Sequence, residues 1–241
     1  AWCLAECCCP STMVDRIVPA TTPADRDRLA ASLGLRDEAA VITEPYHQWV
    51  IEDRFAGERP RWELGGVQFV ADVRPFEAAK LRMLNGTHSA LAYLGLPRGH
   101  EFVHQAVADP VIAPLVDRIL RIEAAATVGL VPGLDLDRYA DALLARFGNS
   151  ALPHRLRQIA MDGSQKIPQR WLRPLALNAA AGRDSPATLR ALAAWILFVR
   201  GDSGPVEDPL AGRLAALWSQ AGSRGICAAL FGDAGVFAQW W

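Results

Sequence analysis

The chain has 241 residues, a formal net charge of −1 and 51% hydrophobic residues. This composition is sufficient for a folded core, and a charge so near zero does not favour binding to nucleic acid or to an anionic membrane surface. No apolar run approaches the ~18 residues of a membrane-spanning helix, and no signal-peptide pattern opens the sequence. We therefore expect a cytoplasmic globular protein without a membrane or nucleic-acid partner.

The strand-like segments of the sequence lie before residue 75. They are expected around residues 4–9, 47–53 and 67–71, and the last two are rich in Val and Ile. A helix is expected over residues 23–33, because Thr22 is a capping residue, Pro23 suits the first helical position, and Gly34 is placed to end the helix. The sequence thus predicts a mixed α/β region over residues 1–74.

Four of the five cysteines fall within the first nine residues. Adjacent cysteines are poor disulfide partners, and no second pair at zinc-ligand spacing follows them. We interpret Cys7 to Cys9 as small buried hydrophobic residues of the first strand. A metal or redox role for the group of Cys3, Cys7, Cys8 and Cys9 is the alternative.

From residue 75 onward the sequence predicts helices. Pro residues preceded by a capping residue indicate helix starts at Asp109, Ser185 and Asp208. The helices are expected over residues 75–94, 110–126, 136–147, 153–161, 186–200 and 209–221. We therefore predict a second, helical domain over residues 75–241.

The distribution of cationic residues distinguishes one position of this helical region. The chain contains 23 arginines and only two lysines, Lys80 and Lys166. A guanidinium keeps its proton in proteins, whereas a desolvated ammonium can release it. Lys80 is therefore a candidate proton-transfer group. Drift of the whole composition toward arginine, with two lysines left by chance, is the alternative explanation.

Three further polar residues share a flank of the predicted helix with Lys80. With Lys80 at zero and ~100° per residue, Glu77 falls near 60°, His88 near 80° and Asn85 near 140°. The rest of this helix is apolar, which is typical of a buried helix. The flank is then either an ion pair between Glu77 and Lys80, or the wall of a site in which lysine is the base and Asn85 and His88 donate hydrogen bonds to a substrate oxygen.

The run from Pro75 to Gly95 resembles the signature of the long-chain mannitol dehydrogenase family, which contains mannitol 2-dehydrogenases and fructuronate reductases (D-mannonate oxidoreductases). The resemblance extends over most of the chain. Its other segments are Ser11–Pro19, Gln48–Asp53, Gly66–Gln68, Arg146–Asn149 and Gln158–Arg170.

The resemblance implies roles for six residues and the cofactor. Lys80 is the implied general base, Asn85 and His88 are implied to hold and polarise the reacting oxygen, and Glu77 to pass the lysine's proton to solvent. The implied substrate-pocket residues are Asp15 and Lys166. For Lys166 an i,i+4 salt bridge with Asp162 is an equal alternative. The implied cofactor is NAD, with NADP possible, no metal is needed, and the implied partner is a sugar or uronate.

The implied fold is mainly α: a multi-helical carboxy-terminal dehydrogenase domain preceded by the end of a Rossmann-like α/β domain. The family is about twice as long, and no G-x-G-x-x-G sequence occurs in this chain, so we expect a carboxy-terminal portion whose main cofactor site lies outside it. The string from Gln158 to Arg170 favours fructuronate reductase, since mannitol 2-dehydrogenases often carry arginine at the position of Gln158. Mannitol 2-dehydrogenase and a non-catalytic helical fragment are the alternatives.

His100 and His104 have the i,i+4 spacing of metal ligands on a helix. No carboxylate or third histidine completes a ligand set, and Gly99 interrupts the start of a helix. We therefore predict that these are histidines of a loop or of the surface.

Overall fold

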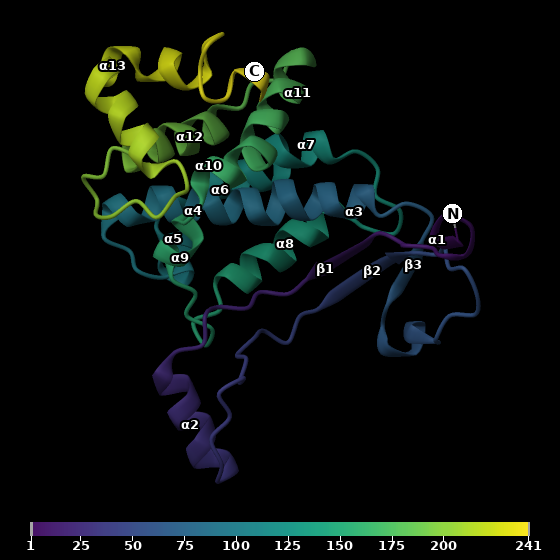
Figure 1. The fold of residues 1–241 in the computed structure, drawn as a ribbon. Coiled ribbons are helices and arrows are strands. Elements are labelled where there is room, and N and C mark those ends of the chain that lie inside the picture. The colour runs from purple at the N-terminus through teal and green to yellow at the C-terminus, as the bar shows by residue number, and fades with distance from the viewer. Residues whose placement is uncertain (1, 241) are drawn as a thin grey trace. The chain divides into compact units, whose positions relative to one another are not determined.

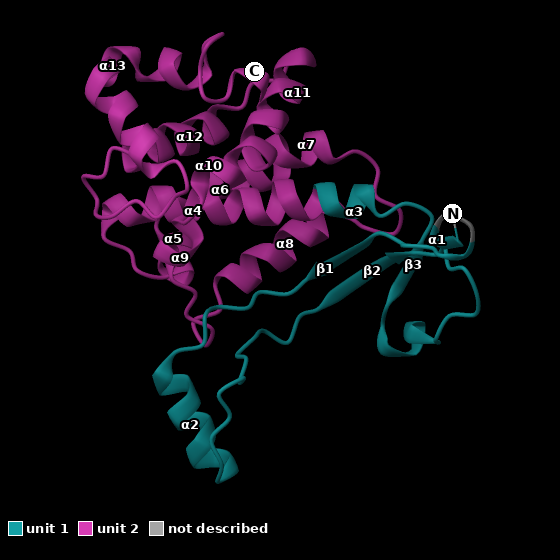
Figure 2. Cartoon of the chain, viewed as in Figure 1, with its two compact units in different colours: residues 1–78 teal, residues 79–241 magenta. Residues whose placement is uncertain are grey.

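The computed structural model describes residues 2–240. The chain divides into two compact units, residues 1–78 (unit 1) and residues 79–241 (unit 2), which Figure 2 distinguishes by colour. The strands of the described residues belong to unit 1, and unit 2 is helical (Figure 1). The prediction of a mainly α chain that begins with a short α/β region is confirmed.

Unit 1 contains a three-stranded sheet in the order β1 (Thr12–Asp15), β2 (Gln48–Glu52), β3 (Gln68–Val70). β1 runs antiparallel to β2, with Met13 opposite Val50, and β2 runs parallel to β3. The side chains of Met13, Val50 and Ile51 are buried, which accounts for the apolar β-branched run of the central strand. The strands predicted near residues 47–53 and 67–71 are confirmed.

The strand predicted at residues 4–9 is wrong. A short helix, α1 (Trp2–Glu6), occupies the first half of that segment, and the first strand comes later, at β1. Leu, Ala and Glu are strong helix formers, and this local preference prevails because β2 pairs with β1 instead. The cysteines are consequently not buried hydrophobic residues of a strand: Cys3, Cys7 and Cys9 are exposed.

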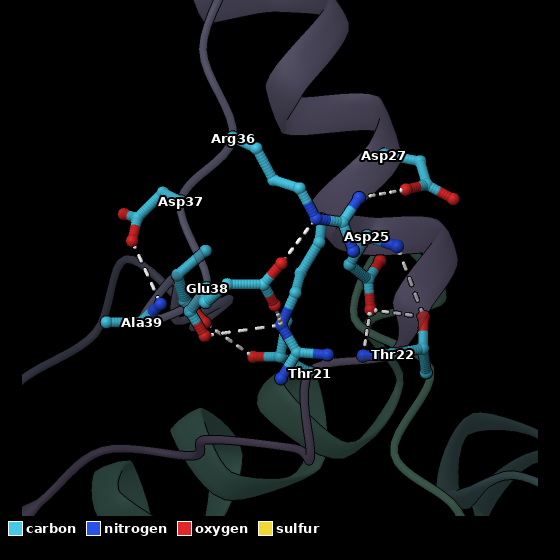
Figure 3. A network of polar contacts seen from close by, with 10 residues as sticks. Thr21, Thr22, Asp25, Asp27, Arg36, Asp37, Glu38 and Ala39 are labelled. Atoms are coloured by element: carbon cyan, nitrogen blue, oxygen red, sulfur yellow. Dashed lines mark hydrogen bonds and ion pairs between the residues drawn. The ribbon is translucent and has the colours of Figure 1, made fainter.

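Helix α2 (Pro23–Leu33) has the bounds that its caps predicted. Thr22 and Asp25 form a reciprocal capping box, and Gly34 ends the helix with φ 73°. Arg36 beyond the helix pairs with Asp27 at 2.6 Å and also with Glu38 (Figure 3). None of the residues of α2 is buried, so the helix depends on these local polar contacts, each of which stabilises an exposed segment only modestly.

The predicted helix over residues 75–94 is present as three consecutive segments, α3 (Arg74–Ala79), the π-helical turn η2 (Lys80–Asn85) and α4 (Gly86–Gly95). The remaining elements of unit 2 are η3 (Leu96–Arg98), α5 (Val103–Ala108), α6 (Ala113–Arg118), η4 (Ile119–Ala124), α7 (Ala125–Val128), α8 (Leu136–Phe147), α9 (Leu156–Ala160), α10 (Gly163–Ile167), η5 (Pro168–Leu172), α11 (Arg173–Ala180), α12 (Pro186–Phe198), α13 (Ala211–Phe231) and η6 (Ala238–Trp240). The helices α5, α10 and α11 were not predicted.

Helix α4 lies in the core of unit 2 and contacts α5, α9 and α12. Its residues are buried except Leu94, which is partly exposed. A Cβ atom at Gly95 would lie 2.7 Å from Leu156 Cδ1 and 3.0 Å from Ala106 Cβ. Glycine at this position therefore allows α5 and α9 to approach α4 closely.

Three π-helical turns interrupt the helices of unit 2, and they lie together. The turn η2 contacts both η4 and η5. A π-helical turn has i→i+5 hydrogen bonds, and such turns occur frequently at functional sites. Because η2 contacts the other two turns, the part of unit 2 that carries Lys80 and Asn85 is a candidate functional site.

Helix α12 begins at Pro186 as predicted, but Ser185 does not cap it. The buried carboxylate of Glu123 does so instead: it accepts hydrogen bonds from the backbone N–H groups of Ala187 at 3.0 Å and Thr188 at 2.8 Å. Arg118 donates to the same carboxylate at 2.8 Å. A residue of η4, more than sixty positions earlier in the chain, therefore supplies the cap of α12.

Candidate functional site

Lys80, Asn85 and His88 occupy the helix that runs from η2 into α4. His88 is buried, while Lys80 and Asn85 are partly exposed. The polar flank of the helix is therefore less buried than the apolar character of the helix predicted. The π-helical turn also changes the phase of the residues after it, because it holds more residues per turn than the 3.6 of an α-helix. The uniform 100° wheel consequently does not describe the directions of these three side chains.

The imidazole of His88 lies in an enclosed, positively charged environment. Its ring packs against Phe147 with centroids 4.6 Å apart and meets the ring of His154 edge-on at 5.4 Å. Burial lowers the pKa of His88 well below its ordinary value, and the nearby His154, Arg170 and Arg146 lower it further. His88 is therefore neutral at physiological pH, and each ring nitrogen can take part in one hydrogen bond, one as donor and the other as acceptor.

The Nε2 atom of His88 is buried and has no hydrogen-bond partner among the described residues. A buried polar atom without a partner costs on the order of 1–3 kcal/mol. In a protein site this cost is offset when a ligand supplies the missing partner. The position of His88 is thus consistent with contact to a ligand oxygen.

Arg170 connects η5 to the helix of the candidate site. Its Nη1 donates to the hydroxyl oxygen of Ser89 at 2.8 Å and to the backbone carbonyl of Asn85 at 3.3 Å. The neighbouring Trp171 donates from Nε1 to the carbonyl of Gly86 at 3.0 Å. Two successive side chains of η5 therefore hold the backbone at the junction of η2 and α4. Burial lowers the pKa of Arg170 to about 10, so it retains its charge at neutral pH.

Lys166 lies one turn before Arg170, at the end of α10. Its ammonium donates to the backbone carbonyl of Met161 at 2.5 Å and is 3.8 Å from the carboxylate of Asp162. Burial lowers the pKa of Lys166, the charge of Arg170 lowers it further, and Asp162 opposes both effects. The predicted ion pair with Asp162 is confirmed but long, and the role of Lys166 in a substrate pocket stays a prediction.

The turn before α10 has a strained backbone. Asp162 has φ 55°, the only positive value for a non-glycine residue among the described residues. A Cβ atom at the next residue, Gly163, would lie 2.5 Å from both the hydroxyl of Tyr93 and Nε1 of Trp195. Strain of this kind persists only where the surroundings enforce it, and it is concentrated at functional sites.

Asp208 holds the beginning of α10 in place. Its carboxylate accepts hydrogen bonds from the backbone N–H and the hydroxyl of Ser164 at 2.7 and 2.5 Å. It also accepts from the N–H of Leu210 at 2.8 Å, near the start of α13. Asp208 therefore links the start of α10 to the turn before α13. The predicted cap at Asp208 is wrong, because the N-cap position of α13 is Leu210 and no side chain caps that helix.

Asp15 and Glu77, the other two candidate residues, belong to unit 1. Asp15 ends β1 and is buried, opposite Gln48 of the neighbouring strand. Glu77 lies in the first turn of α3, as predicted, and is exposed. Within unit 2 the structure brings together Asn85, His88 and, through Arg170, Lys166. The catalytic and binding roles of all six residues stay predictions.

The two histidines with metal-like spacing do not act together. His100 hydrogen-bonds to Asp109 from Nε2 at 2.7 Å, whereas His104 stacks on Phe102 with ring centroids 5.7 Å apart. Both side chains are only partly exposed, so the prediction of a loop or surface position is correct for the loop at His100 and incomplete for His104, which lies in α5. Residues 2–240 contain no group of three His, Cys, Asp or Glu placed to hold a metal ion.

Comparison with known proteins identifies the family. The model of the mannitol dehydrogenase C-terminal domain matches residues 72–238, and that of the mannitol dehydrogenase Rossmann domain matches residues 1–64. The chain belongs to the mannitol dehydrogenase family. In the described part of this family member, no helix is long and apolar enough to traverse a bilayer.

Individual relatives agree with this assignment. The chain is 42% identical to the D-mannonate oxidoreductase of Escherichia coli, over 99% of the chain and 50% of the relative. It is 38% identical to a mannitol 2-dehydrogenase of Pyrenophora tritici-repentis, over 89% of the chain and 39% of the relative. The solved Pseudomonas fluorescens mannitol 2-dehydrogenase, in complex with NAD and D-mannitol, superposes with a TM-score of 0.85 at 35% identity, covering 98% of the chain and 49% of that structure. The chain spans about half the length of these relatives.

Two residues of the candidate site were not singled out from the sequence, Arg170 and His154. Arg170 stands four residues after Lys166 and ends the string that carries the resemblance, which was the available signal. For His154 there was none, because its proximity to His88 depends on the packing of the segment before α9 against α4.

Proposed function

We propose that the chain carries the substrate site and the general acid–base residue of an NAD-dependent oxidoreductase. The enzyme interconverts a keto sugar or keto-uronate with its polyol or aldonate, and fructuronate with mannonate is the favoured pair. The observation that carries this proposal is the conjunction of Lys80, Asn85 and the neutral, unpartnered His88 on one helix of a chain from the mannitol dehydrogenase family. The 42% identity to D-mannonate oxidoreductase supports the acid substrate.

The residues of the chain account for the proton half of this reaction. In oxidation the neutral amine of Lys80 accepts the proton of a secondary alcohol, and in reduction the resulting ammonium returns that proton to the carbonyl oxygen. Asn85 and His88 hold this oxygen by hydrogen bonds, for which a neutral imidazole is suited. We further propose that Glu77 passes the proton to solvent and that Asp15 and Lys166 bind the substrate.

NAD is the proposed cofactor, and it supplies or accepts the hydride when it is bound. The described residues do not fit its pyrophosphate. The link between the parallel strands β2 and β3 contains only the short 3-10 helix η1 (Trp62–Gly65), and no glycine-rich turn opens a helix after a strand. We therefore assign no residue of this chain to the cofactor. We propose that residues 1–74 are the end of a nucleotide-binding domain and residues 75–241 the substrate domain.

Mannitol 2-dehydrogenase is the second candidate function, favoured by the superposition on the Pseudomonas fluorescens enzyme. The test is a comparison of kcat/KM for fructuronate and fructose with NADH, in a polypeptide that joins this chain to a dinucleotide-binding domain of the family. We expect fructuronate to be preferred. If fructose is preferred by more than about tenfold, or ~1.4 kcal/mol of transition-state binding, the mannitol assignment is correct.

A further inference from the structure

The guanidinium of Arg170 is a partly buried cation that has no acidic partner. Its hydrogen bonds are to neutral oxygens, the hydroxyl of Ser89 and the backbone carbonyl of Asn85. Within residues 2–240 it forms no ion pair with an Asp or Glu, and the nearby Asp162 is instead 3.8 Å from Lys166. Removing a charge from water without a counter-charge is costly. Arg118 of the same unit, also partly buried, does have such a partner in Glu123. Arg82 and Arg157 resemble Arg170 in donating to backbone carbonyls, but of these three only Arg170 donates to Asn85 and Ser89.

The free edge of this guanidinium has the geometry of a carboxylate receptor. The two hydrogens of Nη1 serve Ser89 and Asn85, whereas Nε and Nη2 make no hydrogen bond to any described residue. These two nitrogens form the planar fork that binds both oxygens of a carboxylate. Neither is among the buried polar atoms that lack a partner, so a solvent molecule or ligand can reach them.

The nearby acidic groups do not neutralise this fork. Asp208 is engaged with Ser164 and the backbone of Leu210, and Asp162 is near Lys166. The positive charge of Arg170 lowers the pKa of both Lys166 and His88, so Arg170 lies near two candidate site residues. An anion at the fork would therefore lie close to the site and be attracted by Lys166 as well.

We propose that the Nε–Nη2 edge of Arg170 binds the carboxylate of an aldonate or keto-uronate substrate. This inference rests on the proposed function and specifies which cation recognises the acid. The hydrogen bonds of Nη1 hold the guanidinium in place before the substrate arrives, so little side-chain entropy is lost on binding. The same contacts tie the carboxylate receptor to the backbone of Asn85, which is proposed to hold the reacting oxygen.

The test uses the full chain and equilibrium binding, so that it does not depend on a cofactor. D-Mannonate and D-mannitol are titrated by calorimetry into the wild-type chain, Arg170→Lys and Arg170→Gln. We expect the wild-type chain to bind mannonate at least about tenfold more tightly than mannitol, and both variants to lose this preference while mannitol binding is retained. Arg170→Lys keeps the charge and most of the packing but lacks the fork, so it separates bidentate recognition from simple attraction.

Arg173→Gln is the matched control, since Arg173 is exposed and lies three residues further along the chain, at the start of α11. Its preference for mannonate should equal that of the wild-type chain. Equal binding of mannonate and mannitol by the wild-type chain, or an equal loss in Arg173→Gln, overturns the inference and leaves the proposed function intact. If neither compound binds at concentrations on the order of 100 mM, the proposed substrate site itself is overturned. Inorganic phosphate that binds more tightly than mannonate shows a phosphate site and also overturns the inference.

Discussion

The ring of His154 stands perpendicular to that of His88, with centroids 5.4 Å apart. The two imidazoles come from different segments, one from the central helix α4 and the other from the stretch before α9. The pKa of each is lowered, chiefly by burial, that of His154 to about 4. The pair is therefore neutral in the folded protein near pH 7, and protonating it opposes folding.

The first prediction concerns the dependence of stability on pH. The unfolded chain takes up these protons near pH 6.5, whereas folded His154 takes up its proton only near pH 4. The free energy of unfolding should thus be unaffected by these groups above pH 7 and fall as the pH drops from about 6.5 toward 4. Each group contributes a slope of about 1.4 kcal/mol per pH unit in this window. Urea unfolding at a series of pH values measures this slope.

His154→Gln should reduce the slope, because one of the two groups is removed. His47→Gln is the control, since His47 is exposed and belongs to unit 1. A His154→Gln protein with the wild-type slope between pH 6.5 and 4 contradicts the assignment of neutral His154.

The second prediction concerns the cap of α12. Glu123→Ala should lower the free energy of unfolding by at least about 3 kcal/mol, because it leaves the N–H groups of Ala187 and Thr188 and the cation of Arg118 without their acceptor. Ser185→Ala should cost only about 1 kcal/mol, because Ser185 does not cap the helix and its buried hydroxyl loses a single hydrogen bond, from Asn178 Nδ2 at 2.9 Å. Chemical denaturation of both variants measures the two losses, and a loss in Glu123→Ala no larger than that in Ser185→Ala contradicts the role of Glu123 as the cap.

Much of the fold follows from local signals in the sequence. The bounds of α2 and α8 equal those predicted, because a cap begins each helix and a glycine follows its end. The helix predicted to end at residue 221 does end there, because Gly222 has a non-helical backbone with φ 58° and ψ −173°. A second helical segment follows directly and runs to Phe231; this segment was not predicted.

The helical segments that were missed have non-local causes. Pro168 and Pro174 argue against a helix through residues 163–180. The backbone stays helical across both prolines, since the residues at the two junctions have right-handed helical φ and ψ, and the π-helical turn η5 changes the hydrogen-bond pattern between them. The π-helical turn at Lys80 had no sequence signal, because its partners η4 and η5 lie forty to ninety residues away in the chain.

The candidate site was predictable to the extent that it lies on one helix. Lys80, Asn85 and His88 share the segment that the lysine and the resemblance identified. Arg170 became a site residue only through its hydrogen bonds to Ser89 and Asn85, more than eighty residues earlier. A side chain whose role depends on tertiary packing cannot be assigned from spacing within one helix.

The third prediction concerns the strained turn before α10. Gly163→Ala should destabilise the protein by about 1–3 kcal/mol, because its Cβ would lie 2.5 Å from Tyr93 and Trp195, both of which are buried in the core. The matched variant Gly212→Ala lies in helix α13, where a Cβ meets nothing within 4 Å. It should stabilise by up to about 1 kcal/mol through helix propensity. Thermal unfolding of the two proteins should therefore shift in opposite directions, and a neutral Gly163→Ala contradicts the packing described.

The fourth prediction concerns the proposed general base and is measured in a polypeptide that joins this chain to a dinucleotide-binding domain of the family. Lys80→Ala should lower kcat by ~10²–10⁴-fold, the range expected when a general acid or base is removed. Lys80→Arg should be similarly impaired, since a guanidinium has the charge but does not release its proton. Arg173→Gln, an exposed substitution in the same unit, should retain the wild-type rate.

If Lys80 acts only through its positive charge and transfers no proton, the same variants should behave differently. If the lysine only attracts or holds the substrate, Lys80→Arg should keep most of the wild-type kcat and any loss should appear in KM. If it transfers the proton, a small primary amine added to Lys80→Ala should restore part of kcat, and the restored rate should rise with the pKa-dependent fraction of neutral amine. The amine should not rescue Lys80→Arg, because the guanidinium fills the space that the amine needs. Near-wild-type turnover by Lys80→Ala at neutral pH, without added amine, excludes Lys80 as the base.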